Sequence, residues 1–215
     1  NSWCSNEILL IKVCLRYLQT IQGLLWIQIF HLVFFKLKRK YSFFYLNNFD
    51  RITYSRQIIL YDFSINSFFN AEKPKPSWVF QIYNASDVIW HDDTRPNFVT
   101  YNINYFDYLF DLPVDHGLIL ITSWIRDNPP GGSLGWDPYP TSLRLVNWIK
   151  WCWLTKTEAP EITSSIYYQQ EYLKRNLELH LQGNHLLANL KALIFCEKLF
   201  KSAKNKFLVN YLKKQ

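Results

Sequence analysis

The pattern of apolar and polar positions predicts a helical start to the chain, followed by a long stretch with little regular structure. Residues 7–40 repeat apolar side chains at helical spacing, beginning with Ile8, Ile11 and Leu15. We expect one long helix or a broken pair of helices there. Residues 41–100 lack sustained periodicity and are rich in Pro, Asn, Asp and Ser. They are predicted to form an irregular connector with short strands or turns.

Helical signals recur from Tyr105 onward. A helix is predicted over residues 115–126, and the sequence Asn-Pro-Pro-Gly-Gly at 128–132 ends it. Asp137 followed by Pro138 is typical of an N-cap and a first helical residue, which predicts a helix ending near position 154.

Two more helices are predicted in the last third of the chain. The first covers residues 161–181, with Gly183 ending it as the C′ residue, and Asn184 caps the second. Apolar residues at helical spacing then form the predicted buried stripe of the second helix: Leu186, Leu187, Leu190, Leu193, Ile194 and Leu199. Successive helices with short turns and no βαβ alternation indicate an all-α fold of antiparallel helix hairpins.

Composition supports one globular domain and limits the kinds of partner that the protein is expected to bind. The 215 residues are 49% hydrophobic and 18% aromatic, so a sizeable core is expected. Aromatic rings also stack on sugar rings, although filling gaps between helices is the more common use. The net charge of +7 lies in basic runs apart from every motif, which argues against a nucleic-acid partner and is compatible with an acidic polysaccharide.

Cysteine spacing argues against a metal site, and the length of the apolar runs argues against a membrane-spanning helix. The 4 Cys form no CxxC pair or metal-ligand spacing, so we expect small buried hydrophobes, no metal site and no cofactor. The densest apolar stretch, residues 21–35, contains polar residues and is shorter than the roughly 20 needed to cross a bilayer. The chain begins with Asn1 and has no Met, so we expect a fragment of a longer protein.

Four segments in order resemble the N-terminal domain of the heparinase II/III-like polysaccharide lyases, a family that includes alginate and related uronate lyases. They are YNINYFDYL at 101–109, NPPG at 128–131, WDPYPTSLRLVNWIKW at 136–151 and GNHLLAN at 183–189. Residues 15–26 also resemble the leading segment of bacterial members found near cell-surface polysaccharide genes. One departure is Asn104, where relatives commonly have His.

The resemblance implies a fold, a location and a domain organisation. The fold is an incomplete (α/α) toroid, a curved stack of antiparallel helix hairpins, and antiparallel β-sheet domains follow it in full-length relatives. The expected organisation is an N-terminal helical segment at 1–40, a connector at 41–100 and a partial toroid at 101–215, truncated before its C-terminal β-sheet domain. A periplasmic or cell-envelope location is implied.

The implied chemistry is β-elimination from a uronate-containing acidic polysaccharide. A base removes the C5 proton beside the carboxylate, and donors must stabilise the negative charge that develops. By resemblance, Asn184 donates its amide hydrogens to the carboxylate, and His185 assists or acts as the base. The competing interpretation makes Asn184 a helix cap and His185 an ordinary first-turn residue.

The expected substrate-binding residues accompany this pair. Arg144 and Asn147 share a helix face, and Arg suits a carboxylate through its planar fork. Trp136 and Tyr139 are candidate stacking platforms. Tyr105 ranks lower, because a short aromatic helix more often supplies core, and Asn104 can still donate a hydrogen bond in place of the His of relatives. The alternative interpretation pairs Arg144 with a structural Asp and packs both rings between helices.

Two other functions remain open from the sequence. One is a non-catalytic polysaccharide-binding toroid remnant, which turnover assays would distinguish from a lyase. The other is a helical membrane-peripheral scaffold that uses the first helix and the basic cluster at 36–40, as a surface-lying amphipathic helix does.

Overall fold

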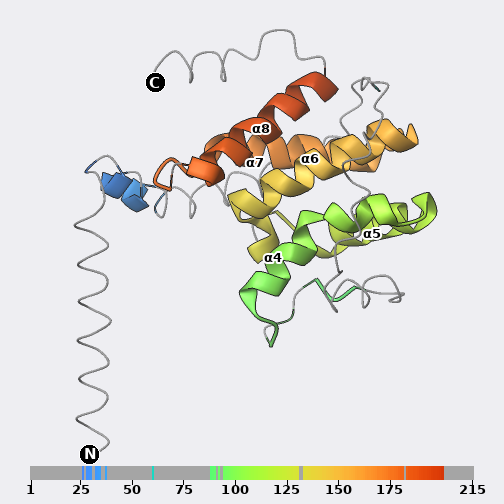
Figure 1. Ribbon diagram of the computed structural model, residues 1–215, viewed down its shortest axis with the longest axis horizontal. Helices are drawn as coiled ribbons and strands as arrows, with labels where there is room; N and C mark the ends of the chain where they lie inside the picture. The colour runs from blue at the N-terminus through green and yellow to red at the C-terminus, as the bar shows by residue number, and fades with distance from the viewer. Residues whose placement is uncertain are drawn as a thin grey trace, which may run out of the picture.

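The computed structural model describes residues 94–130, 133–181 and 183–200, together with positions 26, 28–30, 32–34, 37, 60, 88–90 and 92. The elements of the three long ranges are α4 (Asn97–Tyr105), the 3-10 helix η2 (Asp107–Asp111), α5 (Val114–Asp127), the 3-10 helix η3 (Leu134–Trp136), α6 (Pro138–Thr155), α7 (Pro160–Arg175) and α8 (Gly183–Leu199). No strand occurs in the described part of the chain, so the all-α prediction is confirmed there (Figure 1).

The structure confirms the helices that the sequence predicted for α5 and α6. Helix α5 matches the helix predicted over 115–126, and α6 follows Asp137 with Pro138 in its first turn, as predicted. The proline lacks an N–H that the first turn would leave unsatisfied in any case. Helix α6 ends at Thr155, where Lys156 takes a left-handed conformation with φ 55°.

The boundary between the last two helices differs from the prediction. Helix α7 ends at Arg175 and not near 181, and Asn176 is its C-cap residue. The Asn176 side chain is buried and donates to the Tyr172 carbonyl at 2.8 Å, and its backbone N–H donates to the Leu173 carbonyl. Gly183 begins α8 with φ 51° and is not the C′ residue of the preceding helix.

The connector prediction is wrong at its end, because α4 begins at Asn97 and therefore takes up residues 97–100. Pro96 precedes this helix, where its fixed φ suits a helix start. Positions 26, 28–30, 32–34 and 37 are helical, in agreement with the predicted N-terminal helix. The rest of 7–40 and most of 41–93 lie outside the described residues.

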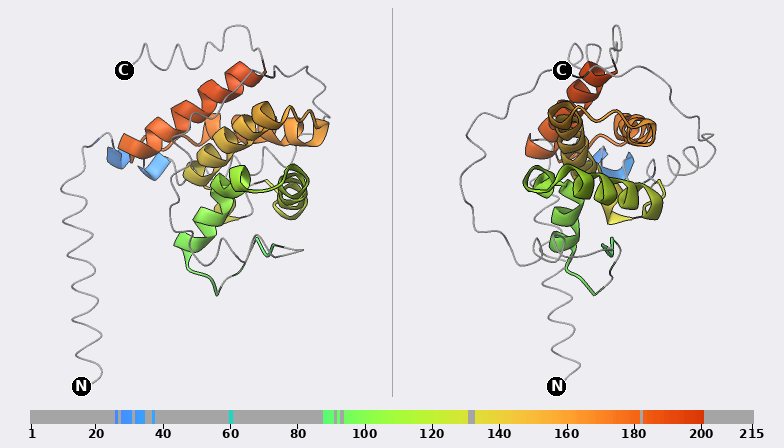
Figure 2. Two further views of the ribbon diagram at one scale, coloured as in Figure 1. Left: turned by 45° about the vertical axis from the view of Figure 1, so that its right-hand side comes forward. Right: turned by 90° about the vertical axis from the view of Figure 1, so that its right-hand side faces the viewer.

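Helix α6 lies at the centre of the described fold (Figures 1 and 2). It packs against α8, α4 and α7, and α5 packs against α7. Residues 156–159 connect α6 to α7, and α7 runs back along α6, so that the two helices form a hairpin. The start of α8 therefore lies beside the start of α6, where the candidate residues of both helices meet.

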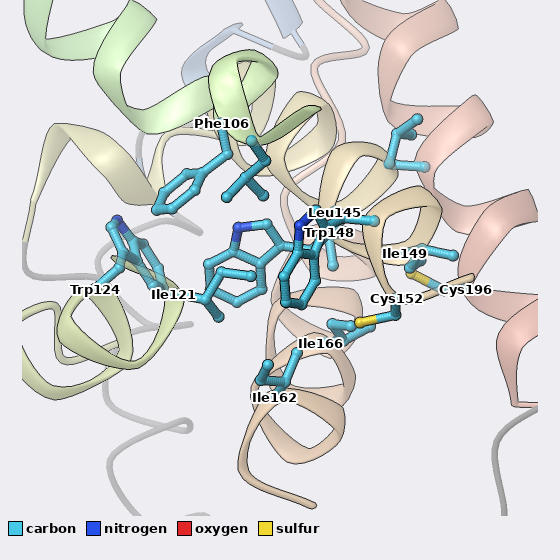
Figure 3. Close-up of a cluster of buried hydrophobic side chains, with 14 of the residues drawn as sticks. Phe106, Ile121, Trp124, Leu145, Trp148, Ile149, Cys152, Ile162, Ile166 and Cys196 are labelled. Atoms are coloured by element: carbon cyan, nitrogen blue, oxygen red, sulfur yellow. The ribbon is translucent and has the colours of Figure 1, made fainter. Parts of the chain in front are cut away.

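Large aromatic side chains fill the interior of this helical stack (Figure 3). Trp124, Trp148 and Trp151 are fully buried, and Trp124 meets the Trp148 ring edge-on at 5.4 Å between centroids. Cys152 and Cys196 are buried free thiols, as expected of small hydrophobes. Many of the aromatics in the described ranges therefore serve packing, which leaves only the exposed ones available for a ligand.

Candidate functional site

Three rings from three helices lie in a row at the surface. His185 in the first turn of α8 stacks on Tyr139 of α6, with 4.3 Å between ring centroids and 33° between planes. Tyr139 meets Tyr105, the last residue of α4, edge to face at 5.9 Å. All three side chains are half-buried, so the row presents part of each ring to solvent. We call Tyr105, Tyr139 and His185 the ring row.

A buried carboxylate lies behind the ring row. Glu178 Oε1 is 3.1 Å from His185 Nδ1, and the side chain of Glu178 is 9% exposed where that of His185 is 42% exposed. Burial raises the pKa of Glu178, while His185 and the Asn189 amide oppose that rise. The charge of nearby Asp137 adds to the rise.

A second carboxyl group, that of Asp137, lies near Glu178 and is hydrogen-bonded to Tyr101. The Tyr101 hydroxyl donates a hydrogen bond to Asp137 Oδ2, which joins the middle of α4 to the N-cap position of α6. The surroundings of His185 therefore contain two carboxyl groups. Two carboxyl groups at one site oppose the approach of another anion.

Asn184 lies beside His185 in the first turn of α8 and is exposed. The predicted capping role does not apply, because the helix begins one residue earlier, at Gly183. This placement removes the competition between capping and ligand binding for the single amide oxygen of Asn184. Asn184 is thus an exposed residue that adjoins His185 in the chain.

Arg144 is fully buried, and its N–H groups serve internal acceptors. Nε donates to Gln169 Oε1 at 2.9 Å, and one terminal nitrogen donates to the Gly135 carbonyl at 2.8 Å. The guanidinium also lies over the Trp124 ring, 3.8 Å from its centroid. The expected contact with a saccharide carboxylate is not supported by this placement. The structural partners of Arg144 are the Gln169 amide, backbone carbonyls and a hydroxyl, not the Asp expected as the alternative.

Three other predicted binding residues also serve the interior. Trp136 is 2% exposed and donates from Nε1 to the Asn128 carbonyl. Asn104 is 1% exposed, accepts from Trp124 Nε1 at 2.7 Å, and donates to the Thr100 carbonyl. Asn147 is half-buried and donates to the Tyr105 carbonyl at 2.8 Å. Of the predicted residues, the structure therefore brings together Tyr105, Tyr139 and His185, and Asn184 is exposed next to His185 in the chain.

Sequence reasoning missed Glu178, Asp137, Tyr101 and Asn189 as members of this site. Glu178 fell inside the helix predicted over 161–181, where it would have been one more solvated charge. Asn176 was the available signal, since Asn favours turns over helix interiors.

In the described ranges, no group of three or more His, Cys, Asp or Glu side chains is arranged to hold a metal ion. The same residues contain no helix with the length and apolar character needed to cross a bilayer.

Comparisons of the chain with protein-family models, with curated proteins and with solved structures find no match. The resemblance to the heparinase II/III-like family therefore stays a prediction that depends on the four motifs.

Proposed function

We propose that this chain contributes the uronate-recognising part of a polysaccharide lyase that cleaves an acidic polysaccharide by β-elimination. The observation that supports the proposal is the contact of His185 with the half-exposed ring of Tyr139, which in turn meets Tyr105, with Asn184 exposed next to His185 in the chain. These residues come from three helices and three of the four sequence motifs. In this proposal the helices belong to an incomplete (α/α) toroid in the periplasm or cell envelope.

The roles follow from the chemistry of each group. His185 Nε2 takes the C5 proton of a uronate, and the amide of Asn184 donates to the carboxylate as negative charge develops on it. The C4–O4 bond then breaks as the C4–C5 double bond forms, and a general acid protonates the departing O4. The imidazolium formed by proton transfer lies 3.1 Å from the Glu178 carboxylate, which stabilises the positive charge. Tyr139 and Tyr105 offer ring surface on which a pyranose stacks.

Electrostatics sets one requirement for the proposal. Asp137 and Glu178 repel a uronate carboxylate locally, so the approach of the polymer depends on the overall charge of +7 and on the neutral donors of Asn184. Binding is therefore expected to weaken as salt increases, because the long-range attraction is screened.

The test is calorimetric binding of uronate oligosaccharides to the 215-residue chain. Carboxyl-reduced oligosaccharides of the same length are the matched ligand control, because they keep the ring faces and lose the charge. His185→Ala is expected to weaken binding about tenfold, which corresponds to a loss of about 1.4 kcal/mol, with His116→Ala on α5 as the matched variant outside the site. Equal affinity for native and carboxyl-reduced ligands, or equal affinity of both variants, would contradict the proposal.

Membrane association is a second candidate, supported by the exposed apolar residues near the start of the chain. Helical positions Trp26, Val33 and Leu37 are 86%, 55% and 59% exposed. The spacing of 7 and 4 residues places them on one face of a helix, beside the basic cluster at 36–40. Sedimentation with anionic vesicles tests this candidate, and Trp26→Ser is expected to reduce binding if the face inserts among lipids.

A further inference from the structure

We propose that Glu178 is the positioning residue of His185. Its carboxylate accepts a hydrogen bond from Nδ1–H and so leaves the Nε2 lone pair directed away, free to take a proton. The consequence for catalysis rests on the proposed function, whereas the state of the imidazole does not. The hydrogen bonds of the buried groups that hold Glu178 in place support this assignment.

The orientation of Asn189 is determined by its partners. The backbone N–H of Glu178 lies 2.9 Å from Asn189 Oδ1, and a backbone nitrogen is only a donor, so this atom of Asn189 must be the oxygen. The amide nitrogen then points to the other side. It lies 3.2 Å from Glu178 Oε2 and 3.0 Å from Ser142 Oγ, and its two hydrogens serve these two acceptors.

Ser142 anchors this arrangement to α6. Its hydroxyl donates to the Pro138 carbonyl at 2.7 Å, and its remaining lone pairs accept from Asn189. Ser142 and Asn189 are both fully buried. A satisfied polar network of this kind holds its members in one geometry, because any alternative leaves a buried group without a partner. Glu178 is therefore held by α6 and α8 at once.

The direction of the hydrogen bond between Glu178 and His185 follows from these donors. Asn189 donates to Oε2, which favours the ionised carboxylate and opposes the rise in the pKa of Glu178 that burial causes; above that pKa Glu178 is ionised. An ionised carboxylate has no hydrogen to give, so Nδ1 must be the donor at 3.1 Å. The neutral imidazole is then the Nδ1–H tautomer, as in other sites where a carboxylate orients a histidine.

Nitrogen-15 NMR of histidine-labelled full chain, recorded at a pH where the imidazole is neutral, tests the assignment. Long-range proton–nitrogen correlations identify which ring nitrogen of His185 carries the hydrogen. The expected result is a protonated Nδ1 and an unprotonated Nε2 in the unsubstituted chain. A dominant Nε2–H tautomer would overturn the proposal, and this measurement does not depend on any variant folding.

A variant pair identifies the group responsible. Glu178→Met removes the acceptor with little change of size and is expected to shift His185 toward the Nε2–H tautomer that an unrestrained imidazole favours in water. Glu158→Met, at an exposed carboxylate before α7, is the control and is expected to leave the tautomer unchanged. Retention of the Nδ1–H form in Glu178→Met would contradict the proposal. Neither experiment contains saccharide, so a failure of the lyase proposal would appear in the calorimetry alone.

Discussion

Replacing Arg144 by methionine should destabilise the helical domain more than replacing any exposed charge in it. The substitution keeps a long flexible side chain but removes all the donors that Gln169 and the Gly135 carbonyl receive at 2.9 and 2.8 Å. Hydrogen bonds from a charged donor contribute about 1.5–3 kcal/mol each, so the two short ones sum to roughly 3–6 kcal/mol. Burial disfavours the charged guanidinium and lowers the pKa of Arg144, which offsets part of that sum.

The net loss is therefore expected to be about 3 kcal/mol in the free energy of unfolding. For a chain of this size, such a loss lowers Tm by roughly 6–12 °C. Differential scanning calorimetry measures the change, with near-ultraviolet circular dichroism to show that the aromatic core is retained. The matched control is Arg126→Met on α5, whose side chain is 66% exposed beside Asp127. Surface pairs of that kind contribute about 0–1 kcal/mol.

A stability of Arg144→Met within about 1 kcal/mol of the unsubstituted chain would refute this reasoning. It would mean that the desolvation cost of the guanidinium cancels its hydrogen bonds and its contact with Trp124. Arg144 would then be a tolerated charge and not a cross-link between α6, η3 and α7.

Three further predictions concern the same region. Gly135→Ala should destabilise by about 1–3 kcal/mol in urea unfolding, because the new Cβ would lie 2.9 Å from Asn104 Cγ and closer still to its oxygen; unchanged stability would show that the buried Asn104 moves freely. Asn184→Ala should change stability by less than about 0.5 kcal/mol, since its side chain is exposed and lies inside the first turn, and a loss near 1 kcal/mol would restore the capping role. Burial raises the pKa of Glu178 above its ordinary 4.5, so its protonated form is favoured by folding. The unfolding free energy of the unsubstituted chain, minus that of Glu178→Gln, should therefore rise as pH falls from 7 through the raised pKa toward 4.5. Thermal unfolding of both proteins at each pH measures this difference. A difference that falls over the same range would contradict the assigned direction of the pKa shift.

Local chemistry in the sequence determined the helical class and several helix boundaries. The Asp137-Pro138 pair predicted the start of α6, and apolar spacing predicted α5, because capping and periodicity act within a few residues. The end of α7 could not be predicted in this way. Asn176 ends that helix from a buried position that exists only once the helices have packed.

The division of the candidate residues between surface and interior was decided by tertiary structure alone. Arg144 and Asn147 lie three positions apart on one helix, yet only packing against α4 and η3 determines that the first is fully buried. The meeting of Glu178 with His185 likewise depends on the turn after α7, which brings a carboxylate back beside the start of α8. Sequence spacing describes one helix at a time, whereas a site formed by three helices depends on how their faces are brought together.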